Sequence, residues 1–170
     1  MISLFVYGIL NIETEVCEFI LTENAAIKSI SLISYNCISS ASWDNKIKTW
    51  NLATKKIDAS CYVYGLFCFI PLSEDSIITG SFDTSVRIWN LKTEDSKKLI
   101  STSSSMIMCV TTLYDGRIIA GFDPDIDIWD IDNNFLYNLK GHKENVTCIA
   151  ELKDGRIVSG SSDNTIIVWY

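Results

Sequence analysis

Short apolar runs rich in Ile, Val, Phe and Thr alternate with polar turn residues along the chain, and no convincing helical period extends over eleven residues or more. Asp115-Gly116 and Asp154-Gly155 each separate two such runs, which is a strong signal for a β-hairpin. The apolar runs are short and rich in β-branched and aromatic residues, as strands usually are. The pattern therefore predicts an all-β chain built from short antiparallel strands.

A repeat of about forty residues organises these strands. Four tryptophans lie 39, 40 and 40 positions apart: Trp50, Trp89, Trp129 and Trp169. The segments that end at them align without gaps, as 42–50, 81–89, 121–129 and 161–169. An aspartate lies six residues before each tryptophan: Asp44, Asp83, Asp123 and Asp163. A recurrence of this kind predicts one structural module repeated four times.

The fourth copy has the fullest motif, with Gly141-His142, Asp154-Gly155, Ser159, Asp163 and Trp169 in order. In this motif, and in its four in-phase copies, the chain resembles the WD-repeat family of β-propellers. The resemblance implies an all-β propeller of four blades, each a four-stranded antiparallel meander. It implies a single domain over 1–170, with outer strands of a preceding or closing blade in 1–21 and repeats at 22–52, 61–91, 101–131 and 141–170.

The resemblance also implies a structural role for four side chains of the last repeat. In the family, such residues form a hydrogen-bonded chain that ties the loops of a blade to its strands; here they are His142, Ser159, Asp163 and Trp169. The other repeats keep only the Asp and Trp pairs, with Thr22-Glu23, Cys61-Tyr62 and Ser101-Thr102 at the Gly-His position. We therefore expect those blades to be less stable. A catalytic His-Asp pair is the alternative, but no nucleophile recurs near it.

Family propellers mostly act as interaction platforms, and the residue before the turn aspartate commonly lies on the surface where partners dock. Those positions hold Trp43, Phe82, Phe122 and Ser162. Glu23, Tyr62 and Thr102, at the Gly-His position, are expected on the same face. Aromatic side chains are frequent hot spots of protein interfaces. The aromatics thus predict either contact with a protein or peptide partner or packing against neighbouring turns, and the sequence leaves both readings open.

The arrangement of the blades has two readings as well. The repeats form either an open arc, whose exposed apolar ends would favour self-association, or a ring closed at four blades or through a partner chain. In a four-bladed ring, residues 13–21 would supply the outer strand of the last blade. A propeller fragment without activity of its own is a further alternative to a scaffold, which would act as an adaptor or substrate receptor.

Charge and cysteine content narrow the function classes. The 14 Lys and Arg against 21 Asp and Glu give a net charge of −7, which argues against nucleic-acid and membrane partners. The six cysteines form no CxxC pair, and most lie in apolar runs, as in 66–70. Reduced core thiols are typical of intracellular proteins, so we expect a cytoplasmic chain, with the nucleus left open. Met1–Leu10 lacks a basic start and a cleavage site, so a strand is the better interpretation than a signal peptide.

Motifs of the common enzyme classes are missing from the sequence. It contains no phosphate-binding GxxxxGK[ST] loop, no HExxH or GxSxG motif and no Cys/His metal cluster. Asp123, Asp125 and Asp127 are spaced like the start of a calcium loop, but Ile128 and Asn134 stand where such a loop needs Gly and Glu. The sequence predicts a non-enzymatic protein without cofactor or metal.

Overall fold

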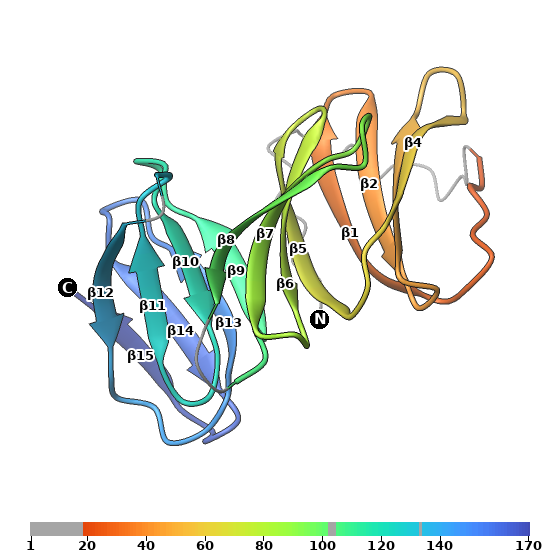
Figure 1. Cartoon of the computed structure of the whole chain (residues 1–170). Helices are drawn as coiled ribbons and strands as arrows, with labels where there is room; N and C mark the ends of the chain where they lie inside the picture. The colour runs from red at the N-terminus through yellow and green to blue at the C-terminus, as the bar shows by residue number, and fades with distance from the viewer. Residues whose placement is uncertain (1–18, 102–104, 133) are drawn as a thin grey trace, which may run out of the picture.

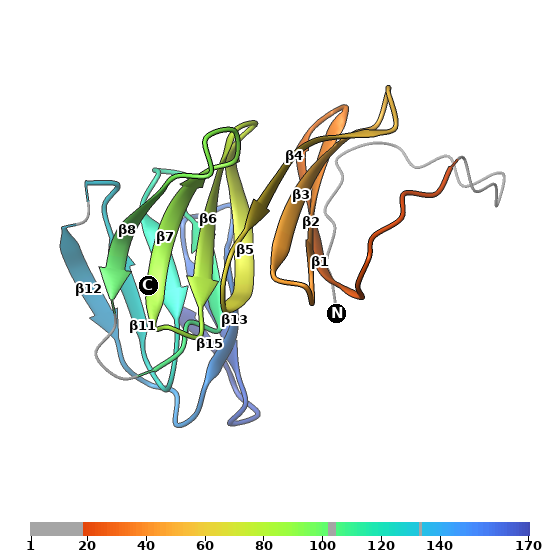
Figure 2. The same cartoon turned by 45° about the vertical axis from the view of Figure 1, so that its right-hand side comes forward.

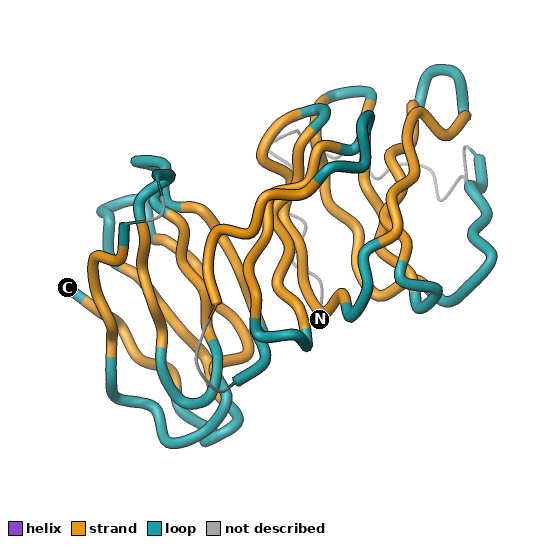
Figure 3. Tube along the Cα trace, in the orientation of Figure 1, coloured by secondary structure: helices purple, strands orange, loops and turns teal. Residues whose placement is uncertain are grey.

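The computed structural model describes residues 19–101, 105–132 and 134–170, and within them the only regular secondary structure is β-strand (Figure 3). The strands form four separate antiparallel sheets. In this part of the chain, no helix is long and apolar enough to cross a membrane.

Each sheet is a meander in which consecutive strands pair. Blade 1 contains β1 (Ile27–Ser34), β2 (Cys37–Ser42), β3 (Lys46–Asn51) and β4 (Lys56–Tyr62). Blade 2 contains β5 (Leu66–Ser73), β6 (Ser76–Ser81), β7 (Ser85–Asn90) and β8 (Ser96–Ser101). Blade 3 contains β9 (Cys109–Thr112), β10 (Ile118–Gly121), β11 (Ile126–Trp129) and β12 (Phe135–Leu139). Blade 4 has three strands among the described residues, β13 (Val146–Glu151), β14 (Ile157–Ser161) and β15 (Ile166–Trp169).

The four blades follow one another along an open arc (Figures 1 and 2). The first strands of successive blades lie side by side, β1 against β5, β5 against β9 and β9 against β13. Blade 1 lies at one end of the arc and the C-terminal blades at the other (Figure 1). The prediction of an all-β chain of propeller blades is confirmed, in its open-arc form.

The core consists of three layers, each between two neighbouring blades. Successive side chains of a strand point to opposite faces, so an inner blade needs apolar residues on both faces of its second strand. Ile77 faces blade 1 and Ile78 faces blade 3, and both are fully buried. In blade 3, Ile118 faces blade 2 and Ile119 faces blade 4. Continuous apolar runs therefore mark the inner blades.

Neighbouring blades approach closely where a glycine faces the next blade. A Cβ atom added to Gly80 would lie 2.5 Å from the Ile107 side chain, and one added to Gly121 would lie 2.9 Å from that of Val146. Both distances are too short for a real contact. The glycines thus allow the first strand of the following blade to pack directly on the sheet.

The turn of blade 3 corrects the ungapped alignment. Gly80 pairs with Val86 and Gly160 with Ile166, six positions on, whereas Gly121 pairs with Ile126, five positions on. The turn is one residue shorter, and every residue of blade 3 before it is displaced by one position relative to the other blades. Phe122 therefore corresponds to Ser81 and Ser161, and not to Phe82.

Residues 1–18 lie outside the described part of the chain, so the expectation of a strand at Met1–Leu10 and most of the expected closing strand at 13–21 fall outside it too. Residues 19–21 are described and belong to no strand. The Lys55 ammonium, in the β3–β4 turn of blade 1, lies 4.7 Å from the centre of the Phe19 ring. The described end of this segment is therefore beside blade 1.

Candidate protein-binding surface

The turns between the second and third strands of three blades share one geometry, set by their aspartates. Asp44, Asp83 and Asp163 each accept a hydrogen bond from the backbone N–H two residues on, at 3.0, 3.0 and 2.9 Å. The residue between takes a left-handed conformation, with φ of 61° at Asn45, 66° at Thr84 and 67° at Asn164. Such side-chain bonds hold tight turns in place. The residue before each aspartate is thereby fixed at the end of its blade.

Two of these positions place aromatic side chains beside a groove between blades 1 and 2. The groove has a volume of about 380 Å³ and is lined by Ile27, Lys28, Trp43, Leu66, Phe67 and Phe82. The rings of Phe67 and Phe82 meet edge to face, with centroids 5.2 Å apart. Trp43 is 67% exposed and Phe82 50% exposed. The groove is thus an apolar surface open to solvent.

Lys28 is the cation of the groove. Its ammonium lies 4.3 Å from the centre of the Trp43 ring and donates a 3.0 Å hydrogen bond to the Leu66 carbonyl. Partial burial lowers the pKa of Lys28 from its usual value. The two contacts leave donor capacity on the ammonium, which has three N–H groups. The groove can therefore offer a hydrogen bond beside its apolar walls.

The other aromatic candidates lie in different surroundings. Tyr62, at the end of β4, is 52% exposed, and its neighbour Val63 bonds to the Asn45 carbonyl in the turn next to Trp43. Phe122 is only 9% exposed and packs in the core layer between blades 2 and 3. It is unavailable to a partner because the short turn of blade 3 moves it inward. For Phe122, the reading as turn packing is the correct one.

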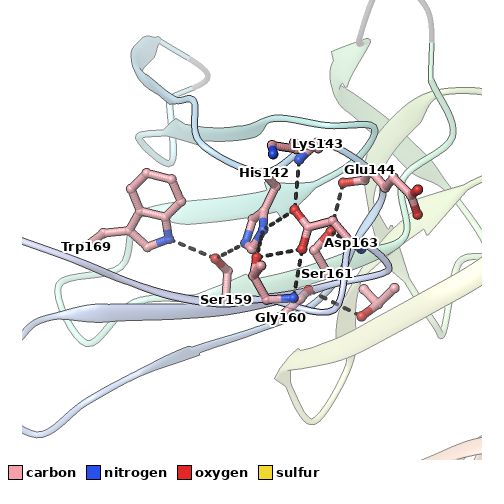
Figure 4. A network of polar contacts seen from close by, with 10 residues as sticks. His142, Lys143, Glu144, Ser159, Gly160, Ser161, Asp163 and Trp169 are labelled. Carbon is pink, nitrogen blue, oxygen red and sulfur yellow. Dashed lines mark hydrogen bonds and ion pairs between the residues drawn. The ribbon is translucent and has the colours of Figure 1, made fainter.

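Blade 4 brings the four predicted side chains of its motif together (Figure 4). The Trp169 indole N–H donates to the Ser159 hydroxyl at 2.8 Å, and the same hydroxyl lies 2.8 Å from His142 Nε2. His142 Nδ1 lies 3.1 Å from Asp163. A proton on Nδ1 satisfies this network, because Ser159 then donates to Nε2 and Asp163 accepts. Gly141 leaves room for the Trp169 ring, since an added Cβ would lie 2.9 Å from it.

Asp163 is the anionic end of this chain. It accepts hydrogen bonds from the Thr165 hydroxyl at 2.5 Å and from the Lys143 backbone N–H at 2.8 Å, besides its contact with His142. The Thr165 hydrogen bond is the largest cause that holds the pKa of Asp163 well below its ordinary value of 3.8. Every partner of the carboxylate is structural, and the imidazole is buried with a serine already bonded to tryptophan. The arrangement ties the loop at 141–143 to the strands.

The equivalent hydrogen-bonded side chains differ in the other blades. In blade 1, Trp50 donates to Ser40 at 2.8 Å, and Ser40 bonds to Glu23, which takes the place of the histidine. In blade 2, Trp89 donates to Thr79 at 3.0 Å, and Tyr62 at the histidine position points to solvent.

Blade 3 keeps least of the chain. Ala120 stands where the other blades have Ser40, Thr79 and Ser159, so β10 offers Trp129 no hydroxyl at this position. The Asp123 carboxylate accepts no turn bond like that of Asp44 within the described residues.

Sequence reasoning missed three residues of these sites. Glu23 was expected on the partner-facing surface beside Tyr62, and this expectation is wrong, because Glu23 pairs with Lys48 and its side chain is almost fully buried. Lys28 and Phe67 occupy the same position in β1 and β5 and line the groove. The sequence feature that could have revealed Lys28 and Phe67 is a cation and an aromatic residue at a strand position that should be half exposed.

Within the described ranges, no group of three or more His, Cys, Asp or Glu is placed to hold a metal ion. In the acidic stretch of blade 3, Asn138 donates to Asp127 at 2.6 Å and to Asp125 at 3.3 Å. Burial raises the pKa of Asp127. These carboxylates are bonded within the blade.

The WD40 family model, described as "WD domain, G-beta repeat", matches residues 58–90 and 133–170. A comparison with curated proteins finds none that matches this sequence. Among solved structures, the WD40 beta propeller domain of Doa1 superposes with a TM-score of 0.76 at 21% identity, over 86% of this chain and 51% of that one. The computationally designed Ika4 protein gives 0.70 at 25% identity, over 88% and 93%. The designed Ika8 protein gives 0.68 at 26% identity, over 87% and 46%.

The WD40 model matches two stretches of the chain, and the blades have the fold of a β-propeller, as in the WD40 domain of Doa1. The chain spans about half the length of the Doa1 and Ika8 chains that it matches. The matches and the blade geometry therefore support a propeller fold of the WD-repeat type.

Proposed function

We propose that the chain is a non-enzymatic scaffold that binds a protein or peptide in the groove between blades 1 and 2. The single observation that carries the proposal is the exposed apolar surface around Trp43, Phe67 and Phe82. Monomeric proteins rarely leave aromatic side chains gathered in one open groove unless a ligand covers them. Turns held by Asp44 and Asp83 keep two of these rings in place before a partner arrives.

The chemistry of the groove defines the partner. An apolar or aromatic side chain fills the space between Trp43 and Phe82, and a carbonyl or carboxylate beside it accepts a bond from Lys28. A short extended segment of a protein supplies both. A chain that captures such a segment would act as an adaptor or substrate receptor in a larger complex.

A reducing, intracellular compartment belongs to this proposal. Five cysteines lie in the described part of the chain, all as free thiols. Burial raises the pKa of Cys61 to about 11 and that of Cys68 to about 12, which keeps both thiols protonated and unreactive.

The test combines Trp43→Ala with Phe82→Ala and uses the full chain as bait. We expect the double variant to keep the thermal melt of the parent, because both side chains are exposed, and to lose the partners that the parent captures. Tyr114→Ala, which changes a 79% exposed aromatic outside the groove, is the matched control and should keep them. Unchanged capture by a folded double variant would overturn the proposal.

A further inference from the structure

The last blade has an apolar face that no described residue covers. Ile166 in β15 is 75% exposed, although the residues at the same register position in the other blades, Ile47, Val86 and Ile126, are completely buried. Val168, two residues on along the same face, is 41% exposed. In the inner blades this face is buried by the first strand of the following blade. Blade 4 therefore has the face of an inner blade without its cover.

The first strand of blade 1 exposes apolar side chains that are buried in the first strand of blade 2. Leu66 and Phe69 of β5 are 1% and 7% exposed, because they pack on blade 1. The residues that correspond to them in β1 are Ile27 and Ile30, which are 49% and 37% exposed. The face of β1 is thus shaped to pack on a preceding blade, which no described residue of this chain supplies.

Each pair of neighbouring blades in the chain meets at a contact that we call a joint. The three joints show how the exposed faces of blade 4 and β1 would pack against each other. In each joint, the buried residue of a third strand shares a core layer with a residue at or just before the start of the next blade's first strand: Ile47 with Leu66, Val86 with Ile107 and Ile126 with Val146. A side chain of the earlier blade also donates to that residue's carbonyl. Lys28 bonds to Leu66 at 3.0 Å, Cys68 to Ile107 at 3.8 Å and Cys109 to Val146 at 3.5 Å.

Blade 4 has a cysteine at the position from which Cys68 and Cys109 bond to the next blade. Cys148 occupies the register position of Cys68 and Cys109, opposite Gly160 as Cys68 is opposite Gly80. Its thiol is exposed, and an added Cβ at Gly160 meets only Cys148 within 4 Å, whereas one at Gly80 meets Ile107 of the next blade. The residue that would complete the joint is the one equivalent to Ile107 and Val146, which in blade 1 is Ile27.

The curvature of the arc excludes contact between these two faces within one chain. The chain superposes over 86% of its length on 51% of the Doa1 propeller domain, so the matched part of the arc curves like about half of that ring. Blade 1 and blade 4 accordingly lie at opposite ends of the arc (Figures 1 and 2).

We propose that two copies of the chain join head to tail and close one ring of eight blades. The exposed face of blade 4 in each copy packs on β1 of the other, with Cys148 against the Ile27 carbonyl. Such heterologous contacts form a closed ring when the rotation closes, and eight blades lie within the known range for propellers. The two faces suit each other because both are uncharged at their centres, with Ile166 and Val168 on one and Ile27 and Ile30 on the other.

The mass of the full chain in solution is the first test. Native mass spectrometry and light scattering should give twice 19.1 kDa for the parent. Ile166→Asp should give a folded monomer, because it places a charge in the joint. Ile131→Asp is the matched control, since Ile131 is 48% exposed in the turn after β11 and away from both faces, and it should remain dimeric. A monomeric parent, or a ladder of larger assemblies, would overturn the closed ring.

A cross-link identifies the joint itself. In the joint between blades 3 and 4, a Cβ at Gly121 would lie 2.7 Å from Cys109 Sγ and 2.9 Å from the Val146 side chain, so the thiol and position 146 are neighbours. Ile27→Cys should therefore form a disulfide with Cys148 of the other copy under mild oxidation, seen as a covalent dimer on a non-reducing gel. Adding Cys148→Ser should abolish it. A dimeric mass without this cross-link would place the interface elsewhere and overturn the proposal.

The groove proposal and the ring proposal fail separately. Ile166 and Cys148 lie in blade 4, whereas Trp43 and Phe82 lie in the first two blades, so loss of the dimer in Ile166→Asp leaves the groove itself intact.

Discussion

Glu23 and Lys48 form a buried ion pair in blade 1, in which Glu23 takes the place that His142 has in blade 4. The side chains of the pair are 3% and 8% exposed. Glu23 also accepts a 2.5 Å hydrogen bond from Ser40, which in turn accepts the Trp50 N–H. Two different chemistries therefore hold the same tryptophan–hydroxyl unit.

Breaking this pair from one side should be costly. Glu23→Gln leaves the Lys48 ammonium buried without a counter-charge, so we expect the free energy of unfolding to fall by about 3 kcal/mol. Urea denaturation measures it. The double variant Glu23→Gln with Lys48→Met removes both charges and should recover most of the loss. Equal losses in the single and double variants would show that the charges do not interact.

The Ser159 hydroxyl should matter more than its counterpart in blade 2. Ser159→Ala leaves the Trp169 N–H and the Nε2 atom of His142 without their partner, and each buried unsatisfied group costs about 1–3 kcal/mol. Thr79→Val removes only the acceptor of Trp89 and keeps the volume. Thermal and urea unfolding should rank Ser159→Ala as clearly the more destabilising. The reverse order would mean that the chain in blade 4 is not the stronger one.

Blade 3 should gain stability from the hydroxyl that it lacks. Ala120→Ser places an acceptor at the register position from which Ser40 and Ser159 serve their tryptophans, and the new bond to Trp129 should add about 1 kcal/mol. A rise in the urea midpoint at unchanged slope is the expected result. Ala120→Cys, of similar size but a weak acceptor, is the control and should not raise the midpoint.

Acid should weaken blade 4. The pKa of Asp163 is lowered by folding, so its ionised form contributes stability above the unfolded value near 3.8, and that contribution is lost as the pH falls through the folded pKa. Urea midpoints of the parent and of Asp163→Asn should therefore differ clearly at pH 6 and converge progressively below about pH 4. A difference that is constant from pH 6 to pH 2 would contradict this assignment.

The strands and the repeat could be predicted from the sequence because each blade repeats its buried positions. Ile77 and Ile78 already show that both faces of a strand are covered. The alignment of blade 3 was wrong because a one-residue deletion lies inside the turn, between Gly121 and Ile126. The aspartate and tryptophan after it keep their spacing, so the period of the tryptophans hides the deletion.

The groove could be predicted only in part. Trp43 and Phe82 belong to the repeated turn, so their position followed from the motif. Lys28 and Phe67 come from first strands, where the pattern separates buried from half-buried positions but does not reveal which neighbouring turn a side chain meets. Glu23 was missed because an exposed role is usual for glutamate, and only a lysine 25 positions away explains its burial.

Because each blade packs against the blades before and after it, the arc behaves as a nearly one-dimensional array with nearest-neighbour coupling. A destabilising substitution in one blade then affects other blades only through the joints with its neighbours. Blade 3 is stabilised by a core layer on each side, so it does not need the hydrogen-bonded side chains around its tryptophan. Blades 1 and 4 each have one such layer among the described residues, and they depend on the contacts of Glu23 and His142. In a single copy separated from its partner, unfolding would accordingly proceed from the two end blades inward.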